Sequence, residues 1–191
     1  MVLNITIPVG RKKDMIPAEE TLKTKESDAV LVAIDNFKKT DMSMNVNKRK
    51  TILEVFDKIS EIESDNRNIE NPDPKSTAKG FFQFNNPSIP TAINRYKNLT
   101  NTNPDWLQSL EKNQNIMSLD YDQQRALAIA NIAFSEGESI NDMNRIAESG
   151  QIMNNMDVYN LYKNYHYVET ENNPISSKAM NNAFRKLGIK Q

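Results

Sequence analysis

The chain has 191 residues, a length that suits one domain, or one domain with an extension, and excludes two full catalytic domains. It has no cysteine and a single histidine, His166, which excludes disulfide scaffolds, thiolate zinc sites, cysteine nucleophiles and multi-histidine metal centres and argues against a Ser-His-Asp hydrolase. A net charge of −1 argues against a nucleic-acid partner, and because no run of about 18 apolar residues occurs, we expect no membrane span.

Residues 1–48 differ in pattern from the rest of the chain. Apolar and polar residues alternate over 5–9, which predicts a short strand, and the apolar run over 29–34 predicts a helix. We interpret this region as an N-terminal arm that docks on the main domain, on another copy or on a larger assembly. A flexible tail is the alternative.

Residues 49–191 carry regular apolar spacing, which predicts a mostly α domain. Thr51 begins a capping-box pattern with Glu54 at the third helical position, and apolar residues at helical spacing follow as far as Ile62. The polar stretch 64–79 contains two prolines, so we expect a loop there.

Further helices are expected after this loop, from apolar periodicity and from their capping residues. They are predicted over 89–99, from Asn103-Pro104 onward, from an Asp120 cap to about 137, over 139–150, over 153–165, and from 174 to about 187.

Glu63 places a carboxylate on the apolar side of the first predicted helix. It lies on the same helical face as Phe56 and Ile59, so we expect it to be turned toward the protein interior at the last turn. Burial and the negative end of the helix dipole both disfavour the charged form of a carboxyl group there. A carboxylic acid kept protonated near neutral pH can act as a general acid. The alternative is a helix-end glutamate that is solvated or paired with a lysine or arginine.

Glu63 and Ser64 end this helix, and the segment after the loop reads Ser76-Thr-Ala-Lys-Gly80-Phe-Phe-Gln83. This order resembles the lytic transglycosylase and goose-type lysozyme superfamily. In that family a helix ends in Glu-Ser, and a polar loop leads to Ser-x-x-Gly-Ala-x-Gly-Leu-Met-Gln. Two phenylalanines stand here where the family has Leu-Met.

Weaker similarity continues to about residue 170. Asn131 ends an alanine-rich stretch that looks like the family's Ala-Tyr-Asn helix, although Ala130 stands in the place of the tyrosine. Tyr165 and Tyr167 lie in a segment that resembles the one carrying a late active-site tyrosine. Both segments also look like phage-encoded, virion-associated murein-degrading domains.

The resemblance implies a lysozyme-like domain that degrades peptidoglycan. It would cleave the β-1,4 bond between N-acetylmuramic acid and N-acetylglucosamine by lytic transglycosylation, with Glu63 as general acid and then base. No metal ion and no organic cofactor is implied. The residues that would bind or orient the glycan strand are Ser64, Ser76, Gln83, Asn131, Tyr165 and Tyr167.

Several of these roles have alternatives. Gln83 either binds substrate or ties the loop to the helix, and Ser76 either orients Glu63 or is the N-cap of a helix. A goose-type hydrolase would need a second carboxylate to position water, for which Asp73 is the first candidate and Asp65 the second. A loop aspartate that caps a turn is the competing interpretation of Asp73.

The cellular setting follows from the same resemblance. No secretory signal is visible, which fits a protein made in the host cytoplasm and packaged in a phage particle, where it would act on the bacterial cell wall. Residues 1–48 would then bind virion or tail proteins. A structural virion protein that keeps the fold without activity is the main alternative, and the departure at Ala130 favours it.

Overall fold

The computed structural model describes most of the chain. The described residues are 46–134, 154–166 and 177–189, together with Ala33, Met143 and Arg145. The expected strand over 5–9 and most of the expected helix over 139–150 lie outside them.

The described part is mostly α-helical, as predicted, and contains no strand. None of its helices is both long enough and apolar enough to cross a membrane. Its α-helices are α2 (Val46–Ser64), α3 (Ile89–Thr100), α4 (Asp105–Asn113), α5 (Tyr121–Ala133), α7 (Asn155–His166) and α8 (Ser177–Lys186), with 3-10 turns η1 (Asn86–Ser88) and η2 (Ile116–Ser118).

Helix α2 begins earlier than its sequence pattern suggested. The prediction of a start at Thr51 is wrong, because the helix already runs from Val46 and Thr51 is only 4% exposed inside it. The residue pattern of a capping box therefore occurs here in the middle of a helix. Backbone N–H groups there already bond to carbonyls one turn earlier, so the pattern marks no helix start. The expected division between residues 48 and 49 also falls inside α2. Ala33, from the region interpreted as an arm, is fully buried in the main hydrophobic core.

The starts of the next helices follow local chemistry more closely. Asp120 caps α5 as predicted, since its carboxylate accepts from the Gln123 N–H at 2.8 Å and the Gln123 side chain accepts from the Asp120 N–H at 3.1 Å. Pro104 occupies the N-cap of α4 itself, one position before the place expected for it. A proline has no N–H to leave unpaired, so it suits either position.

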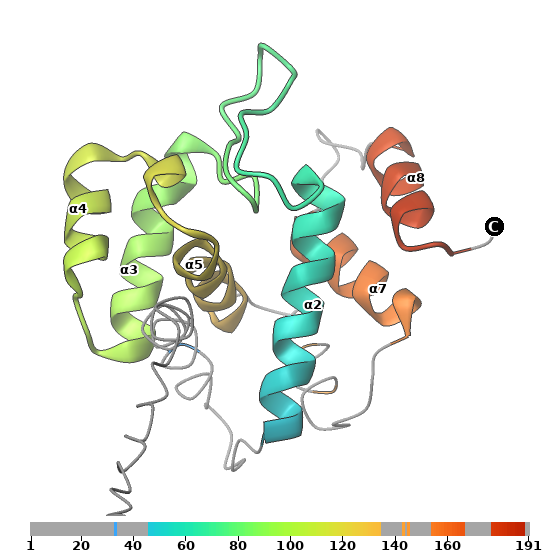
Figure 1. Ribbon diagram of the computed structural model, residues 1–191, viewed down its shortest axis with the longest axis horizontal. Coiled ribbons are helices and arrows are strands. Elements are labelled where there is room, and N and C mark those ends of the chain that lie inside the picture. The colour runs from blue at the N-terminus through green and yellow to red at the C-terminus, as the bar shows by residue number, and fades with distance from the viewer. Residues whose placement is uncertain are drawn as a thin grey trace, which may run out of the picture.

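Helix α5 lies at the centre of the molecule. Every residue from Ala126 to Ile132 is buried, which explains why its sequence shows little amphipathic spacing. In Figure 1, α3 and α4 lie on one side of α5, and α2, α7 and α8 lie on the other. The core is thus built around one apolar helix, with α2 and α3 as its two main walls.

Residues 65–88 connect α2 to α3 and rise above the helices in Figure 1. As predicted, this connection is a loop. Two isolated antiparallel bridges, Glu70 with Lys79 and Lys79 with Phe84, are its only sheet-like contacts among the described residues.

Candidate functional site

A cleft of about 280 Å³ opens between α2, α3, α5 and the end of the 65–88 loop. Its lining mixes apolar and polar side chains, a combination that can hold a ring and direct its polar substituents. The apolar lining residues are Phe56, Ile59, Phe82, Phe84 and Ala128. The polar lining residues are Gln83, Asn85, Ser88, Thr91, Arg95 and Asn131.

Glu63 lies on α2 after the two residues of that helix, Phe56 and Ile59, that line the cleft. It is half-buried and lies one helical turn beyond Ile59 on the same face, about 6 Å further along the helix axis. Long side chains of a helix lean toward its N-terminus, and for Glu63 that direction leads toward Ile59 and the cleft. The predicted acid is not itself among the residues that line the cleft, but it follows the lining residues Phe56 and Ile59 on the same face of α2, in its last turn.

A lysine from α8 closes the end of α2. The Lys186 ammonium donates to the carbonyl oxygens of Glu61 and Ile62 at 2.8 and 3.0 Å, and it lies 2.8 Å from the Asp65 carboxylate. A cation at this position adds a donor to the last carbonyls of the helix, of which that of Glu61 also accepts from the Asp65 N–H at 3.1 Å, and offsets the helix dipole. The hydrogen bond from Lys186 and its positive charge lower the pKa of Asp65 below its usual value. The backbone that carries Glu63 is therefore tied to α8.

Ser64, expected to contact substrate, is 2% exposed. Its hydroxyl lies 2.9 Å from the Phe81 carbonyl oxygen and accepts from the Arg67 N–H at 3.2 Å. The structure thus places Ser64 where it joins the end of α2 to the turn formed by Gly80–Gln83. Substrate contact by Ser64 stays a prediction.

The Gly80–Gln83 turn, defined as residues 80–83, is closed by two backbone hydrogen bonds between Lys79 and Phe84, of 3.1 and 2.9 Å. Gly80 has a φ of +87° and Gln83 a φ of +49°, so both ends of the turn use left-handed backbone.

The Gln83 side chain is engaged within the loop. It donates to the carbonyl oxygens of Gly80 at 2.9 Å and Ile69 at 3.2 Å, and it accepts from the Asn71 amide at 3.0 Å. Gln83 therefore lines the cleft and ties the loop to itself, and none of these three contacts joins the loop to a helix. Its contact with substrate stays a prediction.

Gln124 anchors the turn from α5 and was not singled out from the sequence. Its side chain is fully buried, accepts from the Phe81 N–H at 2.9 Å and donates to the carbonyl oxygens of Ile116 and Leu119 at 3.1 Å each. A Cβ added at Gly80 would lie 2.3 Å from its Oε1, so only glycine fits there. The available signal was an amide one turn before Leu127, just ahead of the apolar run that begins at Ala126.

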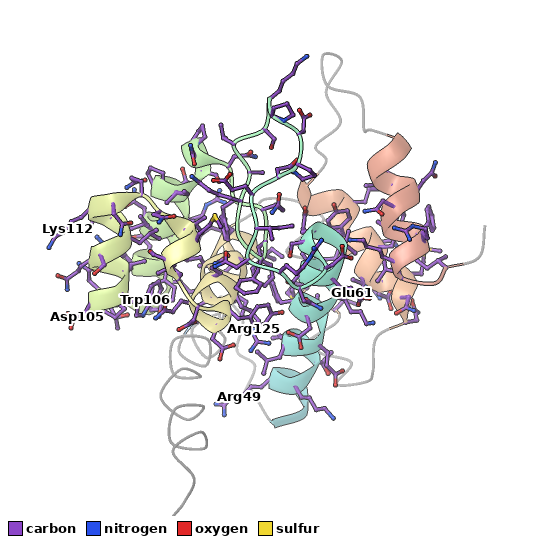
Figure 2. All side chains as sticks on the ribbon, turned by 45° about the horizontal axis from the view of Figure 1, so that its top comes forward. Arg49, Glu61, Asp105, Trp106, Lys112 and Arg125 are labelled. Carbon is purple, nitrogen blue, oxygen red and sulfur yellow. The ribbon has the colours of Figure 1, made fainter. Side chains whose placement is uncertain are left out.

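Helices α2 and α5 are joined by a polar cluster at the surface. Asp57 accepts from the Tyr121 hydroxyl and from Arg125, each at 2.8 Å, and Arg125 also pairs with Asp122. Figure 2 labels Arg125 where α5 approaches α2. Burial is the main cause that raises the pKa of Tyr121. This cluster fixes the spacing of two cleft walls.

Asn131 is among the residues that line the cleft, and its contact with substrate stays a prediction. It is 5% exposed, and its backbone and side-chain oxygens accept from Arg95 at 3.3 and 3.4 Å. The neighbouring Ala130 is fully buried and is not among the residues that line the cleft. The position at which the family carries a tyrosine is therefore core in this protein.

Ser76 and Asp73 lie together at a different place, in a second hollow at the tip of the loop. Asp73 accepts from the Lys75 N–H at 2.9 Å, and Ser76 accepts from the Ala78 N–H at 3.1 Å. These are turn contacts of the kind that serine and aspartate make with their own backbone. Neither residue lines the cleft that holds Gln83 and Asn131.

The two candidate tyrosines fall at the edge of the described residues or beyond it. Tyr165 belongs to α7, but its side chain lies outside the described residues, and Tyr167 lies outside them altogether. Their expected contact with a glycan stays a prediction.

Comparison of the chain with protein-family models, with curated proteins and with solved structures gives no match. Among the described residues, no three His, Asp or Glu side chains are grouped so that they could hold a metal ion. What the site can do therefore follows from its own geometry and from the motifs of the sequence.

Proposed function

We propose that the protein is a lysozyme-like lytic transglycosylase that cleaves the β-1,4 bond between N-acetylmuramic acid and N-acetylglucosamine in peptidoglycan. The observation that carries the proposal is the position of Glu63, half-buried on the helix face whose preceding residues, Phe56 and Ile59, line a cleft. The same cleft contains Gln83 and Asn131, two residues to which the sequence motifs also point.

The surroundings of Glu63 support a role in positioned proton transfer. Lys186 holds the carbonyl oxygens of the two preceding residues, and the following residue, Ser64, is bonded to the Gly80–Gln83 turn. General acid–base catalysis requires a group held within hydrogen-bond reach of the reacting atom, so a fixed backbone favours it.

A single carboxylate is sufficient for this reaction. The Glu63 carboxylic acid would protonate the glycosidic oxygen as the bond to the muramic C1 breaks. The resulting carboxylate would then take the proton of the muramic 6-hydroxyl as that oxygen attacks C1. The products are a 1,6-anhydro end and a free 4-hydroxyl, so the proton and the bonds balance without water.

The hydrolytic alternative has less geometric support. It needs a second carboxylate beside the scissile bond. Asp73 lines the hollow at the loop tip and caps a turn there, while Asp65 is paired with Lys186. Neither carboxylate is among the residues that line the cleft; Glu63 is not one of them either, but unlike Asp73 and Asp65 it shares a helix face with the lining residues Phe56 and Ile59.

One observation favours a second candidate function, that of a structural virion protein without activity. Ala130 is buried where the family has a tyrosine, and the Gln83 amide already has three partners inside the loop. In either case we propose that the protein belongs to a phage particle and that residues 1–48 bind neighbouring virion or tail proteins, a proposal that rests on the resemblance alone.

The test is digestion of purified peptidoglycan, with the soluble products analysed by mass spectrometry. We expect 1,6-anhydromuramyl ends from the wild type and a loss of turnover of about 10²- to 10⁴-fold in Glu63→Gln. Glu61→Gln is the matched control, because Glu61 lies two residues earlier on the opposite side of α2 and pairs with Lys58 at 3.3 Å (Figure 2).

Two outcomes would overturn the proposal. Reducing muramyl ends would identify a hydrolase and direct attention to Asp73. No release by a folded wild type from several wall types would favour the structural role. Circular dichroism of each variant separates lost chemistry from lost folding.

A further inference from the structure

Arg95 is the only charged residue among the described residues that line the cleft. It lies on α3, one turn after Thr91, and its Nη1 donates to both oxygens of Asn131 at 3.3 and 3.4 Å. Within the described part of the chain, these are the only hydrogen bonds of the guanidinium, and no carboxylate there pairs with it.

Two other half-buried cations in the described part of the chain have acidic partners. Arg125 pairs with Asp57 and Asp122, and Lys97 pairs with Glu111 at 2.8 Å. A guanidinium partly withdrawn from water gains most from an anion, and its planar pair of N–H groups matches a carboxylate. Arg95 therefore presents an unused carboxylate-binding group to the cleft.

We propose that Arg95, positioned by Asn131, recognises the carboxylate of an acidic sugar bound in the cleft. The same lining includes Phe82 and Phe84, whose apolar rings can contact a pyranose ring. The cleft volume of about 280 Å³ lies near the lower end of the roughly 300–1,000 Å³ of small-molecule pockets, so it suits one sugar ring better than several.

This inference deepens the proposed function and rests on it for the identity of the sugar. A muramic residue that has lost its stem peptide carries a free lactyl carboxylate, whereas one that still bears the peptide has an amide there and N-acetylglucosamine has neither group. Arg95 would therefore favour peptide-free stretches of the strand and place their muramic residue in the cleft beside Glu63.

The test compares two ligands that differ in one charge, N-acetylmuramic acid and its methyl ester. Each is titrated into the ¹⁵N-labelled full chain, and affinities are taken from amide shifts. We expect the acid to bind about tenfold or more tightly than the ester. Arg95→Gln should remove that difference. Lys112→Gln should keep it, since it deletes one positive charge at the far end of α4 (Figure 2).

A second variant tests the role of Arg95 while keeping the residue, in case Arg95→Gln does not fold. Thr91 is exposed, and Thr91→Glu places a carboxylate one turn before Arg95, where it would pair with the guanidinium. It should also abolish the preference for the acid. An equal affinity of the wild type for acid and ester, or a preference that survives both substitutions, would overturn the inference.

The outcomes of the binding test and of the digestion test distinguish a failure of the Arg95 proposal from a failure of the proposed function. If Arg95 discriminates the acid but no variant or wild type releases muropeptides, the cleft recognises an acidic sugar and the catalytic proposal fails. If anhydro ends are released and the acid has no advantage over the ester, only the role of Arg95 is lost.

Discussion

The 65–88 connection contains two regions that are held in opposite ways. Its tip, residues 71–77, is stabilised by contacts between near neighbours, such as the Asp73 carboxylate with the Lys75 N–H. Its Gly80–Gln83 turn is held by partners far along the chain, because Phe81 bonds to Ser64 on α2 and to Gln124 on α5. Residues 72–75 are exposed, whereas most of the turn is buried.

The comparison shows that residues singled out by one motif can contribute very differently to the stability of the fold. A local turn contact forms in water and contributes little to folding, because its groups are solvated either way. A buried contact that joins two helices leaves unpaired polar groups when it is removed. The free energy of unfolding should therefore respond strongly to changes in the turn and weakly to changes in the tip.

The largest expected effect is that of Gly80→Ala. The substitution forces a side chain into left-handed backbone and brings Cβ against Gln124, so we expect a loss of about 2–5 kcal/mol in urea denaturation. Gly188→Ala is the matched control. Gly188 has a φ of +63° with no atom within 4 Å of the added Cβ, and should lose only about 1 kcal/mol. Equal losses at the two glycines would mean that the Gln124 contact does not constrain the turn.

Gln124→Leu should come next, with a loss of about 2–3 kcal/mol. It leaves the Phe81 N–H and two carbonyl oxygens buried without their partner. Gln123→Leu, the same change one residue earlier, removes a single capping contact and should cost about 1 kcal/mol. Hydrogen exchange supplies a local readout, since the Phe81 amide should lose protection only in the Gln124 variant. Unchanged protection would contradict the role of Gln124 as anchor.

The caps of Asp120 with Gln123 and the anchor Gln124 show what the sequence could predict and what it could not. The Asp120 cap was predictable because its partner lies three residues away, and the helices were predictable because periodicity is local. Gln124 was not, because its partner Phe81 is separated from it by the whole of α3 and α4. The same holds for the cleft: helical spacing together with the Glu-Ser motif points to Glu63, but the lining residues come from three helices and one loop, whose packing no single pattern encodes.

The ion pair between Asp65 and Lys186 should give a pH-dependent effect on the α2 side of the turn. Because Lys186 lowers the pKa of folded Asp65, the contribution of the pair is fully present above the unfolded value near 3.8. It is lost as the pH falls through the lower, folded pKa. The difference in unfolding free energy between wild type and Asp65→Asn should thus be constant at neutral pH and shrink below about pH 4. NMR titration of the Asp65 carboxyl measures the shift directly, and a midpoint at the ordinary value would contradict it.

The smallest effects are expected at the tip. Asp73→Ala and Ser76→Ala each remove one local contact, so we expect changes within about 0.5 kcal/mol. Asn71→Ala should cost more, because the Asn71 amide also bonds to Gln83 and so belongs to the turn as well as to the tip.

Asp73→Ala also tests the chemistry that the two regions would support. If Glu63 acts alone, this variant should digest peptidoglycan at the wild-type rate and release the same anhydro ends, since Asp73 lines a separate hollow. A loss of turnover without a loss of stability would mean that the tip closes over the cleft in the complex and supplies a second carboxylate. The contrast between a fixed turn and a locally bonded tip would then describe a catalytic device, in which the turn holds the acid and the tip delivers the water.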